Sequence, residues 1–433
     1  MKKYNNLKLV LAGLILITAA CKTEIDAPAV SKGGADFTKY IAIGNSLTSG
    51  YADGGLYLEG QLNSYPNIIA QQMKAAGGGD FKQPLFTEAQ SNGSGYLRFD
   101  GFNADGSPKL VQVTDKLAYR NTAKQFTKYT DEINNLGVPG MRLDLAVSPF
   151  AVSFSAQNPY FERLLPDVEV GTKTYLQFAG GRNHTFFTCW LGNNDVLGWA
   201  TNGGVSAGDP TKTLTSKTNF TQAYNALIAT LTAQGQKGAV ANIPDVTAIP
   251  YFNTVTVAAI NAGLKANPQT TNYSLLINAL NPTTGLHSAR PATNEDLIVL
   301  TFKTADIGVN GYGLSPLNPI ADNQVLDKAE VAIAQDFVNS YNATIKSVAE
   351  AKGLALFDAY TFLNSFKGDG VAIDGVEFNS GFIKGNAFSL DGVHLTQKGY
   401  AVVANGFIKA INAKYSSTLN TVSLANYPAV KFP

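Results

Sequence analysis

Short apolar runs alternate with amphipathic segments along most of this chain. The runs are rich in β-branched and aromatic residues, which favour strands, and three of the four end at a Gly or Pro. Between them, apolar residues recur at helical spacing. This alternation predicts an α/β fold with a mostly parallel sheet, whose sites gather at the carboxyl ends of the strands. The predicted strands span 37–43, 184–191, 237–244 and 354–360, and the main predicted helices span 65–79, 216–235, 326–353 and 396–412.

Two stretches interrupt the alternation. GYLRFDGFNADGSPKLVQV (95–113) predicts a hairpin around its Asp-Gly pair, within an insertion near 75–130. Residues 245–325 are rich in Asn, Pro and Thr, and we expect irregular loops or a cap over one face of the sheet there. The composition, 45% apolar and 15% charged, suits a large buried core. We therefore expect residues 37–433 to form a single domain that carries both insertions.

The N-terminus has the pattern of an export signal. Lysines precede an apolar stretch from Leu9 to Ile17, which is too short to span a membrane, and small residues lead to Cys21. Residues 1–20 resemble a bacterial lipoprotein signal peptide. The resemblance implies export, lipidation of Cys21 and an acyl anchor at the cell envelope, on the outer membrane or cell surface. Residues 21–36 predict a flexible tether. The alternative is a secreted protein with an incidental cysteine.

Charge and composition argue against several classes of partner. Lys plus Arg total 33 and Asp plus Glu total 32, so no overall field favours nucleic acid. Phosphate-binding glycine loops and basic aromatic patches are missing from the sequence. Asp-Gly pairs at 103–106 and 368–375 lack the ligand periodicity of a calcium loop, so we expect neither a metal nor a cofactor. With Cys21 lipidated, Cys189 would have no partner for an intrachain disulfide.

Ser46 is a candidate nucleophile. It lies just beyond the predicted strand 37–43, between glycines that allow sharp turns, so its hydroxyl is exposed on a rigid element. A serine also needs a neighbouring base. Of the three histidines, His394 has a carboxylate at turn-like spacing, Asp391, which could fix its tautomer. These three side chains could therefore form a catalytic triad.

Three other features have simpler explanations. His184 precedes an apolar strand, where a hydrogen-bonded structural role fits better, and His287 lies in the irregular region, where a loop role fits better. GVSAG (204–208) matches the nucleophile elbow of α/β-hydrolases letter for letter. No strand precedes it, however, and Asp209-Pro210 obstructs the helix that must follow.

Two further loops could supply hydrogen-bond donors. LGNNDVLGWA (191–200) places asparagine amides at the end of a predicted strand, where a neutral donor can bind a developing oxyanion without competing for the proton of the base. NNLGVPGMR (134–142) follows a β-like run and offers a glycine N–H. Taken alone, the first loop is better explained as a plain loop, and the second can be explained as a turn.

Together and in this order, the four stretches resemble the four blocks of the SGNH subgroup of GDSL-type esterases and lipases. The resemblance implies a three-layer α/β/α, flavodoxin-like fold. It implies Ser46 as nucleophile, His394 as base and Asp391 as its partner. It also implies an oxyanion hole formed by the N–H groups of Ser46 and Gly140 and the side chain of Asn194. Here Asn45 replaces the usual Asp of the serine block, which is not the base of the family. We expect this to change the hydrogen bonds of the loop more than the mechanism.

The resemblance implies a serine hydrolase that cleaves a small-molecule, lipid or polysaccharide ester through an acyl-enzyme on Ser46, with no cofactor. Two alternatives remain open. One is a carbohydrate O-acetyl esterase of the same fold, in which Trp190, Trp199 and Tyr251 would stack on sugar. The other is a non-catalytic ligand-binding lipoprotein, although binding alone does not require a serine, a histidine and an aspartate together.

Overall fold

The computed structural model describes residues 29–104, 106–147 and 156–433. The chain divides into two units, Met1–Val30 and Ser31–Pro433, and the second contains all that follows. The predicted signal peptide, Cys21 and the first part of the predicted tether lie outside the described residues. In the described ranges, no helix combines the length and apolar character needed to cross a membrane.

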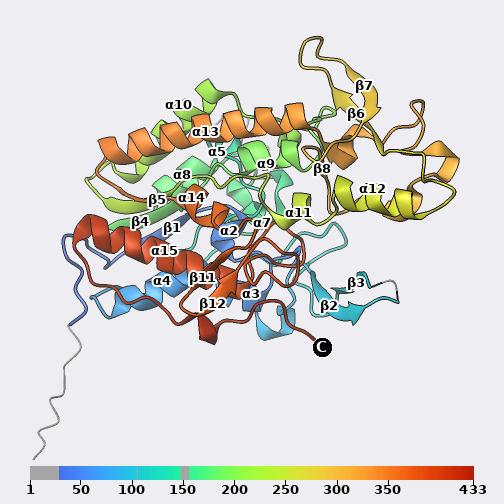
Figure 1. The fold of residues 1–433 in the computed structure, drawn as a ribbon. Coiled ribbons are helices and arrows are strands. Elements are labelled where there is room, and N and C mark those ends of the chain that lie inside the picture. The colour runs from blue at the N-terminus through green and yellow to red at the C-terminus, as the bar shows by residue number, and fades with distance from the viewer. Residues whose placement is uncertain (1–28, 105, 148–155) are drawn as a thin grey trace, which may run out of the picture. The chain divides into compact units, whose positions relative to one another are not determined.

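An all-parallel sheet of four strands lies at the centre of the second unit (Figure 1). Tyr40 of the first strand pairs with Phe186 of its neighbour, and a parallel bridge from Ala42 to Asn135 continues the sheet on the other side. These segments all run in the same direction, so their carboxyl ends share one edge. The predicted mostly parallel α/β fold is confirmed. In spatial order the strands are β1 (Tyr40–Gly44), β4 (Phe186–Trp190), β5 (Lys237–Ala241) and β10 (Ala355–Phe357).

Helices cover both faces of this sheet (Figure 1). On one face, Trp190 of β4 packs edge-on against Tyr65 and Phe407, which belong to two different helices. On the other face, Phe220 stacks on Tyr341 with ring centroids 3.8 Å apart. The result is three layers. The first face carries α4 (Tyr65–Lys74) and α15 (Gln397–Tyr415), and the second carries α8 (Tyr175–Gly180), α10 (Lys217–Leu231) and α13 (Lys328–Ala351).

The long helices begin at capping residues that the sequence supplies. The side chain of Ser216 accepts the N–H of Asn219 at the start of α10, and Thr396 does the same for Gly399 in α15. Asp327 and Glu330 form a reciprocal capping box at the start of α13. These side chains satisfy N–H groups that the first helical turn leaves unpaired, which fixes where each helix starts.

The structure of the first insertion agrees with the sequence-based prediction, and that of the second agrees only in part. The hairpin of 95–113 is present, as β2 (Tyr96–Phe102) and β3 (Pro108–Val113). The expectation of irregular loops over 245–325 was wrong in part, because this segment contains two helices and a second hairpin. Its elements are too short for a periodic pattern to show. They are α11 (Pro250–Asn253), α12 (Val257–Ala266), β6 (Leu276–Leu280), β7 (His287–Pro291) and β8 (Leu297–Ile298), which pairs with β9 (Val325–Leu326).

Short helices follow several strands directly at the carboxyl edge of the sheet. α2 (Ser46–Ser49) follows β1, α9 (Asn194–Ala200) follows β4, and α14 (Ala359–Asn364) follows β10. The first residues of these helices therefore lie where a parallel sheet places its sites. The remaining short elements are α3 (Leu58–Leu62), α5 (Leu143–Val147), α7 (Pro159–Glu162), β11 (Val371–Ile373) and β12 (Val376–Phe378).

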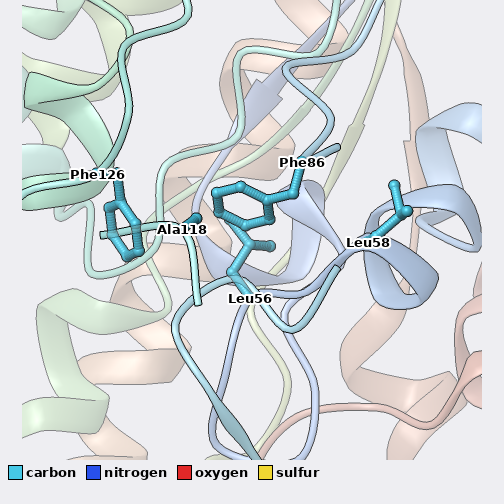
Figure 2. Close-up of a cluster of buried hydrophobic side chains, with 5 residues drawn as sticks. All are labelled: Leu56, Leu58, Phe86, Ala118 and Phe126. Carbon is cyan, nitrogen blue, oxygen red and sulfur yellow. The ribbon is translucent and has the colours of Figure 1, made fainter. Parts of the chain in front are cut away.

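A hydrophobic cluster joins the first insertion to the segment that follows α2. Figure 2 shows Leu56 and Leu58 from that segment beside Phe86, Ala118 and Phe126 from the insertion. All five side chains are buried, and partly buried tyrosines, including Tyr51, pack against them. The insertion is thus fixed to the stretch of chain that carries Ser46.

Candidate active site

Ser46 occupies the first position of α2, directly after β1. The side chain of Asn45 caps this helix by accepting the N–H of Leu47 at 3.1 Å. A Cβ at Gly44 would lie 2.0 Å from a side-chain atom of the next turn, so only glycine fits there. Gly50 ends the helix with φ of 84°, a conformation that favours glycine. Sharp turns on both sides thus hold Ser46 at the carboxyl edge of the sheet.

Ser46, His394 and Asp391 form a continuous hydrogen-bonded chain. Nε2 of His394 lies 2.8 Å from Oγ of Ser46, and Nδ1 lies 2.8 Å from Oδ2 of Asp391. A carboxylate can only accept, so Nδ1 carries the proton and Nε2 is free to accept the hydroxyl proton of Ser46. The structure brings the three predicted residues together in the order that nucleophilic catalysis needs.

The environment of Asp391 keeps this carboxyl ionised. Burial, the largest single influence, would raise its pKa, but the charge interaction and hydrogen bond with His394 and the main-chain donors together outweigh burial. The main-chain N–H groups of His394 and Val393 donate to Oδ1 at 2.8 and 2.9 Å. The N–H of Gly54 donates to Oδ2 at 2.9 Å. Together they hold the pKa of Asp391 well below its usual range, so a fixed negative charge can stabilise the imidazolium.

Tyr51 packs against the imidazole of His394, with ring centroids 4.6 Å apart. Its hydroxyl donates to the carbonyl of Gly54 at 2.6 Å, and burial raises the pKa of Tyr51 well above its usual value. It is therefore a neutral aromatic wall that limits the positions open to the ring. Neither periodicity nor spacing in the sequence indicates this contact.

Asn194 and Gly140, the two other predicted donors, lie on neighbouring loops. Asn194 begins α9, and its Nδ2 donates to the carbonyl of Met141 at 2.9 Å. An amide nitrogen carries two hydrogens, so one remains for an oxyanion. Gly140 has φ of 77°. Asn194 and Gly140 line the same cavity as His394. A smaller pocket beside this cavity is lined by Ser46 and also by Asn194.

Arg142 and Asp195 tie these two loops together. The guanidinium of Arg142 donates to the carbonyl of Asn194 at 3.1 Å and forms a two-point contact with Asp144. In the opposite direction, Asp195 accepts the N–H of Leu143 at 2.7 Å. Sequence reasoning did not find this pair of cross-links, because each residue acts on a loop distant in the chain.

Two spaces meet at the reacting groups. A pocket of about 40 Å³ lies beside Ser46, and a cavity of about 820 Å³ lies beside His394. The expectation that tryptophans stack on sugar was wrong, because Trp190 is fully buried and Trp199 is 9% exposed. Both indole rings pack in the interior of the protein. Tyr251 does line the large cavity.

The competing candidates lie in structural settings. Both ring nitrogens of His184 lie 2.9 Å from main-chain carbonyls, those of Arg182 and Leu231, which fits the expected structural role. His287 lies on β7, 3.5 Å from Glu330. Ser206 of the GVSAG sequence lies in an irregular stretch between two turns rather than between a strand and a helix. Across the described parts of the chain, no three His, Cys, Asp or Glu side chains are grouped to hold a metal ion.

Comparison with known proteins identifies one family. The model of the GDSL-like lipase/acylhydrolase family matches residues 40–407. No curated protein sequence matches the chain.

The solved structures that resemble this chain do so distantly. An alpha/beta hydrolase from the metagenome of Lake Arreo, Spain, is 11% identical, with 88% of this chain and 97% of that chain covered and a TM-score of 0.34. A mutant of an acetyl-xylooligosaccharide esterase from Geobacillus stearmophilus is 9% identical, with 88% and 96% covered and a TM-score of 0.35. A lipase/acylhydrolase from Enterococcus faecalis is 10% identical, with 89% and 99% covered and a TM-score of 0.33.

Proposed function

Because this chain belongs to the GDSL-like lipase/acylhydrolase family, we propose that it cleaves carboxylic esters through an acyl-enzyme on Ser46. Ester hydrolysis is the general activity of the family. The observation that supports the serine mechanism is the pair of 2.8 Å hydrogen bonds that join Ser46, His394 and Asp391. In a protein that only bound a ligand, nothing would require an ionised carboxylate, an oriented imidazole and a serine hydroxyl in one line.

The first half of the reaction forms the acyl-enzyme. Nε2 of His394 takes the hydroxyl proton of Ser46 while Oγ attacks the acyl carbon. The resulting oxyanion accepts hydrogen bonds from the N–H groups of Ser46 and Gly140 and from the amide of Asn194. The imidazolium, stabilised by Asp391, then gives its proton to the leaving alcohol as the ester bond breaks.

The second half releases the acid. A water molecule gives a proton to Nε2 of His394 as its oxygen attacks the acyl carbon. The same donors hold the second oxyanion. Collapse of this intermediate breaks the bond to Oγ, which recovers its proton from the imidazolium. The products are one carboxylic acid and one alcohol, and the enzyme returns to its starting state.

The test compares Ser46→Ala with Ser206→Ala, since Ser206 lies in the competing GVSAG sequence. Hydrolysis of p-nitrophenyl acetate and covalent labelling by a fluorophosphonate are measured on both purified variants. We expect Ser46→Ala to lose both signals and Ser206→Ala to keep both. Undiminished hydrolysis by Ser46→Ala would end the assignment.

The N-terminal pattern supports a proposal about location: Cys21 carries acyl chains that anchor the exported protein at the cell envelope. The test expresses the full chain and its Cys21→Ala variant in a bacterial host with a labelled fatty acid. We expect label and membrane association for the wild type and neither for the variant. Equal membrane association of the two would overturn the proposal.

A further inference from the structure

The large cavity beside His394 is walled mainly by segments outside the four catalytic loops. The β2–β3 hairpin, the 245–325 segment and the stretch before the His394 loop each contribute apolar side chains. Those side chains include Leu97, Leu110, Val255, Leu300 and Phe382. At about 820 Å³, the cavity falls within the range of small-molecule sites, roughly 300–1,000 Å³.

The charged side chains in the described lining are already engaged. Arg142 contacts Asp144 through two nitrogens and also donates to three main-chain carbonyls. Asp391 is held by His394 and by main-chain N–H groups. An ionic group on a substrate would therefore enter this lining without a free counter-charge, at a large desolvation cost.

The cavity meets the small pocket at the reacting groups. Asn194, Leu197, Val393 and His394 line both spaces. An ester carbonyl held between Ser46 and the Asn194 amide can therefore extend one of its two substituents, the acyl chain or the alcohol, into this apolar cavity.

We propose that this cavity receives an uncharged hydrocarbon chain, so that the enzyme prefers lipid-like esters to short esters and acetylated sugars. This inference depends on the proposed function. Each methylene that leaves water for an apolar wall favours binding by about three- to fourfold. The hydroxyl groups of a sugar would instead be desolvated against a surface that is mostly apolar, where lining hydroxyls such as those of Thr201 and Thr254 already donate to main-chain carbonyls.

Two substrate series test the preference in the wild-type enzyme. One varies the acyl chain of p-nitrophenyl esters from acetate to palmitate, and the other varies the alkyl chain of n-alkyl acetates over the same lengths. We expect kcat/KM to rise at least about tenfold from the two-carbon to the eight-carbon member of one series. The series that rises identifies the chain as acyl or alcohol. Values that are flat or fall with length in both series, or faster release of acetate from acetylated xylan, would overturn the inference.

Variants of the wall test the place of binding. Leu110→Glu and Leu300→Glu introduce a charge on two different segments, and Leu317→Glu makes the same change at a side chain that is 96% exposed. We expect each wall variant to lower kcat/KM for the octanoyl or octyl ester at least about tenfold more than it lowers kcat/KM for the acetate ester. Leu317→Glu should match the wild type. Equal losses for short and long esters would place the chain elsewhere.

The two proposals fail in different ways. If the wild type is neither labelled by the fluorophosphonate nor active on any ester, the serine mechanism itself is wrong. If it is labelled and cleaves acetate esters but does not favour chains, only the assignment of the cavity is wrong. Circular dichroism melting of each variant separates a change in substrate preference from a loss of folding.

Discussion

Asp53 holds the loop that carries His394: its Oδ1 accepts the main-chain N–H of Leu390 at 3.0 Å. The N–H of Asp53 in turn donates to Oγ of Ser389 at 2.9 Å. Asp53 lies in the turn that follows α2, so the segments carrying Ser46 and His394 are joined by side-chain hydrogen bonds in both directions. The distance between nucleophile and base thus depends on a residue that does not touch either of them.

The first prediction concerns the pH dependence that Asp53 confers. Burial raises its pKa to about 6 and the nearby charge of Asp391 adds to this, while hydrogen bonds from Leu390 and Tyr57 oppose it. Between about pH 4 and 6 the folded protein then keeps a proton that the unfolded chain has lost. The free energy of unfolding therefore falls as pH rises through this window.

Asp53→Asn keeps an oxygen for the N–H of Leu390 but cannot ionise. We expect the unfolding free energy of the variant, relative to the wild type, to increase by up to about 3 kcal/mol from pH 4 to pH 7. Urea unfolding across this range measures the difference. Parallel curves for the two proteins would show that Asp53 is not the group that titrates.

The second prediction concerns Asp391. An amide at this position would no longer favour the His394 tautomer with a proton on Nδ1 or stabilise the imidazolium. We expect Asp391→Asn to lower kcat by about 10⁴-fold with a much smaller change in KM. Asp336→Asn is the control, because this carboxylate is 65% exposed and pairs with Lys217. Steady-state kinetics on both variants gives the answer, and a loss under about tenfold in Asp391→Asn would contradict the assigned role.

The third prediction separates backbone strain from catalysis at Gly140. Gly140 and Gly77 have φ of 77° and 85°, so alanine at either position costs about 1–2 kcal/mol. Gly77 has no neighbouring atom within 4 Å of an added Cβ, which makes it a matched control. Alanine keeps the main-chain N–H, but relief of the backbone strain at Gly140 shifts this N–H from its place beside the oxyanion. We therefore expect similar losses of thermal stability in both variants and a fall in kcat, of about tenfold or more, in Gly140→Ala alone. Equal kcat values would remove Gly140 from the oxyanion hole.

The fourth prediction compares two adjacent asparagines. Asn194→Ala should lower kcat by about 10²–10³-fold, because one oxyanion donor is lost. The lost hydrogen bond to Met141 should cost only about 1 kcal/mol of stability. Asn193→Ala removes the same atoms one residue earlier and should lower kcat by less than about tenfold. If Asn193→Ala has the lower kcat of the two, the amide donor is Asn193 and not Asn194.

The residues that the sequence identified share one property: each lies in a local pattern that carries its own chemistry. Ser46 follows an apolar run between two glycines, and Asp391 and His394 lie three residues apart in one turn. Parallel strands end at a common edge, so a fold prediction was sufficient to bring the two stretches together.

Other residues of the site could not be found in this way. Tyr51, Asp53 and Arg142 act on loops that are distant in the sequence, and neither periodicity nor spacing relates them to their targets. The short helices of 245–325 were missed for a different reason, since four or ten residues give too little repetition to distinguish a helix from a turn.

The large cavity takes most of its walls from stretches of chain that contribute nothing to proton transfer. Its chemical selectivity can therefore diverge while the reaction stays the same. Exchanging the β2–β3 hairpin or the 245–325 segment with that of a relative should retarget the enzyme, and random mutagenesis confined to these two stretches offers a route to catalysts for new compounds.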